Sequence, residues 1–387
     1  MYPDWPKSSS DLVPLPHCDG PKLNPFPFQG PQKITFLEYL GEGLHAHVVK
    51  VEIQGQIYAL KLFRFPHDQD WLGPSNNVDR KDLEAMSAFY NYSEPFNCEC
   101  RAFGRLQEAG YEKIAVKCYG YLLLDEEHER AVRDRFKDLN LSFSGNPEYP
   151  EPEDEKDTMR WRYPCDDGRR PPIRGIVKEF GSKSDELTTA YVRRILLDVT
   201  RFHQLGIIHI DLADRQLINS KICDLSTAIT TPHYITTPEL NPQLTPEWLS
   251  AMEYELFQFS RNDFRNFDDM ITEWNVEHEK KKEIKVYAFP RGCGSQMERS
   301  VRNTPSRMGV YSLVDPRLYD WRSSTTRPRN GSGGEVISNN RHLKTNPPKW
   351  YLNCSEELAA KLRVETSFST SLEWEVMDGL IHPRKKR

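Results

Sequence analysis

The middle of the sequence reads His209-Ile210-Asp211-Leu212-Ala213-Asp214-Arg215-Gln216, and Ile222-Cys223-Asp224-Leu225-Ser226 follows shortly after. Asp211 ends the largely apolar run Ile207-Ile208-His209-Ile210, and Asp224 follows Ile222-Cys223, so each aspartate ends a strand-like run and opens a loop. Either aspartate alone is more simply a helix cap or a turn residue. Together they are also what phosphoryl transfer needs, because one carboxylate accepts a hydroxyl proton and another holds magnesium.

A glycine-rich turn and a lysine inside an apolar strand lie upstream of these aspartates. The turn is Leu40-Gly41-Glu42-Gly43-Leu44-His45-Ala46-His47-Val48, whose glycines let the backbone approach a phosphate. By itself it is weak evidence, because hairpins use glycine for steric reasons. Lys61 closes the run Tyr58-Ala59-Leu60-Lys61, where a charge needs a partner or a ligand. The alternative is an edge-strand lysine that extends its ammonium group into water.

The spacing of apolar residues predicts an α+β chain. Alternation between 33 and 65 predicts three antiparallel strands, and the apolar runs 114–124 and 173–180 predict two more buried strands. Helical spacing predicts helices over 96–110, 187–206 and 248–274.

Taken in order, these pieces resemble the protein-kinase signature set over residues 36–275. Gly41, Gly43 and Val48 match the glycine-rich loop that covers the phosphates, although Ala46 replaces its third glycine. Lys61 matches the lysine of V-A-I-K. The resemblance therefore implies that these residues bind ATP.

A glutamate on a following helix should pair with that lysine in a kinase-like protein. Glu99 is the best match, because Phe103 follows four residues later on the core face of the expected helix. Glu84 and Glu94 lie in less periodic surroundings.

The two aspartates match the catalytic H-R-D and the metal-binding D-F-G, so Asp211 is the expected proton acceptor and Asp224 the expected magnesium ligand. Ile210 replaces the arginine that couples this loop to an activation-loop phosphate. Gln216 stands where an asparagine holds the second magnesium, on an arm one methylene longer. Leu225-Ser226 replaces Phe-Gly. These departures put the catalytic geometry in doubt.

The resemblance implies a two-lobed protein-kinase-like fold, with an N-terminal antiparallel sheet lobe, a truncated helical C-lobe and a basic C-terminal extension. Asp268 or Asp269 is the expected aspartate that opens the central helix of the second lobe. The expected parts are a Pro-rich extended arm at 1–32, an N-lobe at 33–181 with an acidic insert at 142–172 that is expected to be disordered, a C-lobe at 182–279, and a basic, partly flexible region at 280–387.

The net charge of −5 conceals two parts of opposite sign. Residues 280–387 hold 21 Lys and Arg against 11 Asp and Glu, which gives +10 and leaves −15 for the first 279 residues. Such asymmetry favours a tail, ending in Arg384-Lys385-Lys386-Arg387, that contacts DNA or an acidic partner or serves nuclear import. The alternative is that the tail lies on the chain's own acidic part.

Other classes of protein are not supported. No apolar run approaches the roughly 18 residues of a membrane span, and the first residues do not predict a secretory signal. The eight cysteines show no C-x-x-C spacing, which suits reduced thiols and no metal site. We therefore expect a cytosolic or nuclear protein.

Three stretches give a narrower resemblance: Phe36-Leu37-Glu38-Tyr39-Leu40-Gly41-Glu42-Gly43, Cys98-Glu99-Cys100-Arg101-Ala102-Phe103-Gly104-Arg105-Leu106 and His203-Gln204-Leu205-Gly206-Ile207-Ile208. The chain resembles the kinase-like subunit family of the fungal Sim4 kinetochore complex, the second of the Fta proteins. This implies a nuclear protein at centromeric chromatin that works with other kinetochore subunits. Two functions stay open: a kinase-fold scaffold that is catalytically weak or dead, and an active kinase that uses ATP and magnesium on a protein or small-molecule hydroxyl.

Overall fold

The computed structural model describes residues 1–71, 81–152, 158–183, 186–233, 235–240, 246–279, 281–288, 316–324, 372–377 and 380–385. The chain divides into two compact units. The first comprises Met1–Lys183 and Lys221–Thr227, and the second comprises Ser184–Ser220 and Ala228–Arg387. Each unit is described by itself. Most of the basic region 280–387 lies outside the described residues.

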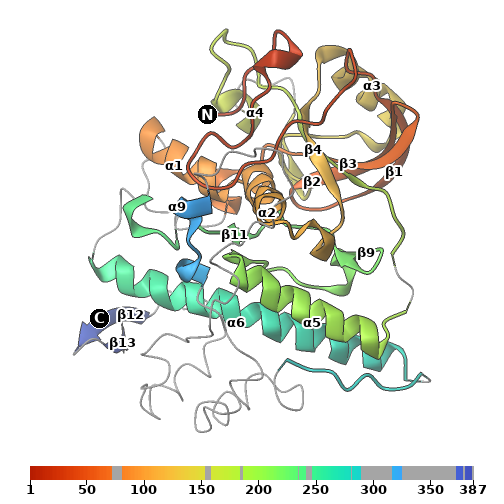
Figure 1. Ribbon diagram of the computed structural model, residues 1–387. Helices are drawn as coiled ribbons and strands as arrows, with labels where there is room; N and C mark the ends of the chain where they lie inside the picture. The colour runs from red at the N-terminus through yellow and green to blue at the C-terminus, as the bar shows by residue number, and fades with distance from the viewer. Residues whose placement is uncertain are drawn as a thin grey trace. The chain divides into compact units, whose positions relative to one another are not determined.

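A five-stranded antiparallel sheet forms the core of the first unit (Figure 1). Its order is β1 (Thr35–Glu42), β2 (Ala46–Ile53), β3 (Gln56–Phe63), β7 (Arg174–Glu179) and β4 (Cys118–Leu123). The sequence prediction of three strands followed by two more is confirmed. Gly41 pairs with Val48, Val48 with Lys61, and Lys61 with Ile176. This register places the four residues in one row across the sheet, with the side chains of Val48, Lys61 and Ile176 on one face.

The helices of this unit are α1 (Leu83–Ser93), α2 (Pro95–Ala109), α3 (Glu126–Arg135) and the short α4 (Met159–Arg162). The predicted helix α2 is confirmed. Glu94 accepts a hydrogen bond from the Asn97 amide at its start, and Gly110, with φ +74°, ends it in the left-handed conformation. Helices α1 and α3 were not predicted. The guanidinium of Arg135, at the end of α3, donates to the carbonyls of Phe36 and Leu37 on edge strand β1.

The Pro-rich arm was expected to be extended; it contains a short 3-10 helix, Ser9–Asp11, and it packs against the rest of the first unit. Leu15, Leu23 and Phe26 are buried. The Phe26 amide donates to the Tyr121 carbonyl at 2.7 Å, and the Tyr121 amide donates to the Asn24 carbonyl at 3.1 Å. The arm therefore pairs with strand β4 at the opposite edge of the sheet from β1.

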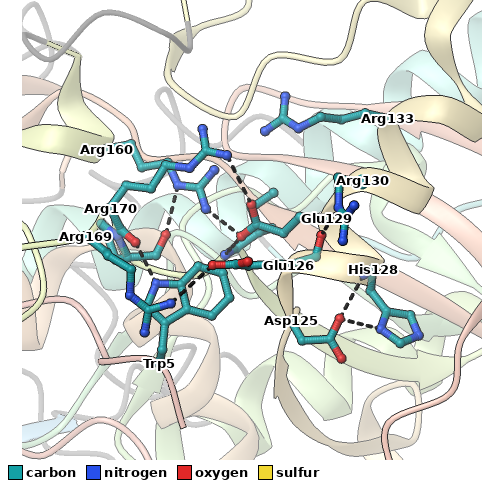
Figure 2. Close-up of polar contacts among 12 residues, drawn as sticks. Trp5, Asp125, Glu126, His128, Glu129, Arg130, Arg133, Arg160, Arg169 and Arg170 are labelled. Carbon is teal, nitrogen blue, oxygen red and sulfur yellow. Dashed lines mark hydrogen bonds and ion pairs between the residues drawn. The ribbon is translucent and has the colours of Figure 1, made fainter. Parts of the chain in front are cut away.

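The acidic insert is folded wherever it is described, which corrects the expectation of a disordered loop; residues 153–157 lie outside the described part. It contains a small hairpin of β5 (Gly145–Asn146) and β6 (Tyr149–Pro150), and then α4. Arg160 of α4 lies 2.5 Å from Glu129 of α3, and both side chains are buried (Figure 2). This ion pair depends on a residue 31 positions away, so local sequence does not reveal it.

The second unit contains two long helices, α5 (Thr189–Gln204) and α6 (Pro246–Glu277), which lie side by side (Figure 1). Both are close to the predicted ranges. Its short elements are β8 (Ile207–Ile208), β9 (Leu217–Ile218), β11 (Ile229–Thr230), α9 (Trp321–Ser324), β12 (Leu372–Met377) and β13 (Leu380–Lys385). Strand β8 pairs with β11, and β12 pairs with β13, both antiparallel. The remaining strand β10 (Lys221–Ile222) belongs to the first unit.

Candidate functional site

A buried cluster of two lysines and two carboxylates lies on the first unit. The ammonium of Lys61, on β3, is 2.8 Å from Oε2 of Glu99, on α2, and 2.6 Å from Oδ1 of Asp224. Glu99 has no exposed surface, and Asp224 is partly exposed. Three residues that are distant in the sequence thus meet at one point.

At these distances, each charge favours the ionised form of its oppositely charged neighbour. Burial by itself raises the pKa of Asp224, but the charges of Lys61 and Lys178 outweigh burial and hold that pKa well below its ordinary value. Burial by itself lowers the pKa of Lys61, but Asp224 and Glu99 outweigh it and raise that pKa above its ordinary value. The net result favours a charged Lys61 beside a charged Asp224.

Lys178 is a fourth member that the sequence analysis did not single out. It lies on β7 and is only 6% exposed. Its ammonium forms an ion pair with Oε1 of Glu99 and donates to the Cys223 carbonyl at 2.7 Å. The signal was available, because Lys178 is a lysine within an apolar strand, the same pattern that identified Lys61.

The glycine-rich turn connects strand β1 to strand β2. Gly41 has φ +139°, a conformation that favours glycine, and a Cβ added at Gly41 or Gly43 would meet nothing within 4 Å. The Gly43 amide donates to the Ala46 carbonyl at 2.9 Å. His45 of the same turn lies 3.3 Å from the hydroxyl of Ser226, two residues after Asp224. The turn thus has free space beside the backbone of its two glycines, and it contacts the segment that carries Asp224.

Asp211 and Gln216 lie together on the second unit. The side-chain amide of Gln216 donates to Oδ2 of Asp211 at 2.8 Å, and Arg215 donates to Oδ1 at 2.5 Å. Both carboxylate oxygens of Asp211 therefore already accept a hydrogen bond.

The backbone before Asp211 is held by Asp263, which lies inside α6. Its carboxylate accepts the amide of His209 at 2.8 Å and that of Ile210 at 2.6 Å, and it also contacts the imidazole of His203 at 2.8 Å. Ile210 has φ +73°, which a β-branched residue rarely adopts. The carboxylate of Asp263 thus fixes an unfavourable backbone turn immediately before Asp211.

This finding corrects the expectation for Asp268 and Asp269. Neither opens α6, which begins at Pro246, and Asp268 instead accepts the backbone amide of Ala288. The sequence offered no way to choose among three aspartates within one helix, because the choice depends on which of them faces His209.

The predicted site residues are thus placed in two groups. Gly41, Gly43, Val48, Lys61, Glu99 and Asp224 belong to the first unit, whereas Asp211 and Gln216 belong to the second. Among the described residues, no group of three or more His, Cys, Asp or Glu gathers in a way that would hold a metal ion. No helix in the described part of the chain is long and apolar enough to cross a membrane.

The fold and the cluster define a mixed α/β protein whose five-stranded antiparallel sheet carries a buried lysine–carboxylate site. A family model described as kinetochore Sim4 complex subunit FTA2 matches residues 12–229, more than half of the chain. The chain belongs to this family. A search of curated proteins finds no match.

Proposed function

We propose that this chain is a kinase-fold subunit of a fungal kinetochore complex that acts mainly as a scaffold and has a nucleotide-binding site. The ion pair between Lys61 on the third strand and Glu99 on helix α2, at 2.8 Å, carries the proposal. Protein kinases place a lysine of the third strand against a glutamate of a neighbouring helix in the same way. The order of the sheet and the glycine turn before β2 support the same fold.

The residues of the first unit suit a nucleoside triphosphate and magnesium. Gly41 and Gly43 leave space for phosphate oxygens near the backbone. Lys61 supplies positive charge, and Asp224 supplies a carboxylate, the kind of ligand that magnesium prefers. When bound, the nucleotide and metal would supply a transferable phosphoryl group.

Several observations favour a scaffold over an active kinase. Asp211 already accepts hydrogen bonds from Arg215 and Gln216, so a substrate hydroxyl has to compete with them. The amide nitrogen of Gln216 is engaged in that contact. Leu225-Ser226 also lacks the phenylalanine and glycine that kinases use to switch state.

The alternative is an active kinase. It is favoured because Lys61, Glu99, Asp211 and Asp224 are all present, and because Lys61 is paired with both Glu99 and Asp224 in the first unit. In that case Asp211 would accept the proton of the substrate hydroxyl, Asp224 would be a magnesium ligand, and Gln216 is the further magnesium ligand that the kinase resemblance implies.

Membership of the family further supports a place in the nucleus, at the centromere, among other subunits of the complex. We propose that the basic region 280–387 supplies any contact with DNA or an acidic partner. If the import role is correct, deleting residues 383–387 from a tagged protein should reduce its nuclear accumulation.

A thermal-shift titration with ATP and magnesium tests the nucleotide site. Ligand at about 100 times its Kd should add about 2.7 kcal/mol to the stability, and Lys61→Met and Asp224→Asn should each abolish the shift. Lys50→Met is the matched control, because Lys50 lies on the adjacent strand in a surface ion pair. No shift at millimolar ATP would exclude the active kinase.

A second measurement separates scaffold from kinase. If the chain is a scaffold, Asp211→Asn should still assemble with the other subunits of the complex, and cells that depend on the protein should tolerate it. Phosphate transfer by the purified wild-type complex that disappears in Asp211→Asn would support the kinase instead.

A further inference from the structure

The carboxylate of Glu99 has two cations, one on each oxygen. Lys61 contacts Oε2, and Lys178 contacts Oε1. The sheet register explains how both reach it: Lys61 pairs with Ile176, so Lys178, two residues along β7, projects from the same face. A carboxylate without exposed surface is therefore neutralised from two neighbouring strands.

Lys178 makes a second contact that Lys61 does not make. Its ammonium donates to the Cys223 carbonyl at 2.7 Å, and Cys223 directly precedes Asp224. It also lies 5.3 Å from the ring of Phe103, one turn after Glu99 on the same helix. Lys178 thus joins strand β7, helix α2 and the backbone that positions Asp224.

We propose that Lys178 is a positioning residue: it keeps Glu99 and the Asp224 segment in place while Lys61 exchanges Asp224 for a phosphate of the ligand. This inference deepens the proposed nucleotide site and rests on it. The chemistry follows from the charges, since two lysines balance Glu99 and Asp224. A bound phosphate attracts Lys61 away from Asp224, and Asp224 becomes available to a divalent cation.

The burial of Glu99 makes the second lysine necessary. A buried charge that loses its partner is strongly destabilised, so a helix held through Lys61 alone would loosen whenever Lys61 moved toward a ligand. With Lys178 in place, Glu99 keeps one cation in both states. The two lysines consequently have different tasks, although both contact the same carboxylate.

Hydrogen–deuterium exchange of the full chain tests this division without any ligand. The peptides to follow cover α2 (95–109) and residues 221–227. Lys61→Met should leave the protection of α2 close to wild type, because Glu99 keeps Lys178. Lys178→Met leaves Lys61 to neutralise both Glu99 and Asp224 and removes the donor to the Cys223 carbonyl, so it should speed exchange in both peptides by about tenfold or more. Lys178→Arg, which keeps the charge, should restore protection in α2. The inference is overturned if Lys61→Met loosens α2 as much as Lys178→Met does, or if Lys178→Met loosens neither peptide.

Lys178→Gln serves where the methionine variant fails to fold. It keeps a donor for the Cys223 carbonyl but loses the charge on Glu99, so it should loosen α2 more than residues 221–227. The inference would also be overturned if each peptide were protected as strongly in Lys178→Gln as in wild type.

A nucleotide-binding measurement, with ATP and magnesium, uses the same variants. Lys178→Arg should bind as wild type, and Lys178→Gln should bind about tenfold more weakly or worse. If wild type binds no nucleotide, the proposed function fails, whereas the exchange measurements still decide whether Lys178 anchors Glu99. If Lys178→Gln binds as tightly as wild type, the positioning role is wrong and the nucleotide site stands.

Discussion

Replacing Glu129 by glutamine should destabilise the first unit by about 3 kcal/mol or more, near the lower end of the cost of breaking a buried ion pair. Glutamine preserves the size of the side chain and can still accept the Ile173 amide, which donates to Glu129 at 2.8 Å. It removes the negative charge that faces the guanidinium of Arg160, whose side chain is only 1% exposed (Figure 2). Arg170, at 3.9 Å from Glu129, is one-third exposed and can turn to water.

Urea unfolding measures this loss. With a slope of about 1–3 kcal/mol per molar urea, the midpoint should fall by about 1 M or more. Glu126→Gln is the matched control, because it lies on the same helix, is 67% exposed and pairs with Arg169 at the surface; its cost should stay below about 1 kcal/mol. The double variant Arg160→Met with Glu129→Met should recover most of the loss. A cost below about 1 kcal/mol for Glu129→Gln would refute the view that this pair anchors the insert.

Three further results are expected. Burial, with the charge of Arg64, lowers the pKa of His47 to about 4. Since the unfolded chain binds this proton below about pH 6.5, the unfolding free energy should fall by up to about 3 kcal/mol between pH 6.5 and 4. Urea unfolding of His47→Gln at several pH values should lack this part of the pH dependence. Gly104→Ala places a Cβ 2.5 Å from the Lys22 carbonyl oxygen, so it should cost about 1–3 kcal/mol in a melting experiment, whereas Gly43→Ala should be nearly neutral. The pKa of Asp224 is held well below its ordinary value, so the ionised carboxylate stabilises the protein above about pH 4 and this contribution is lost in acid. The difference in unfolding free energy between wild type and Asp224→Asn should therefore shrink from pH 5 to pH 3. A constant difference would contradict the ion pair.

The sequence was sufficient where the pattern is local. Alternating residues predicted the strands, and Gly110 predicted the end of α2. The four-residue step from Glu99 to Phe103 was enough to choose Glu99 over Glu94, and the structure places Glu99 beside Lys61.

The sequence was insufficient where burial depends on distant partners. Helix α3 is rich in charge and reads as surface, yet Glu129 is buried because Arg160 reaches it from the insert. Asp263 could not be chosen from sequence, because its role depends on facing the backbone of His209 and Ile210. Lys178 is a different case, since the reasoning applied to Lys61 would have found it.

The pairing of the N-terminal arm with β4 has a consequence for assembly. An exposed edge strand invites another chain to extend the sheet, which leads to aggregation or domain swapping. Here the arm occupies the β4 edge at Asn24 and Phe26, and Arg135 takes two carbonyls of the β1 edge. Each edge of this sheet is thus partly covered, which hinders strand addition by a neighbour. We therefore expect other subunits to recognise this unit through side chains, and a chain shortened by its arm to self-associate as its concentration rises.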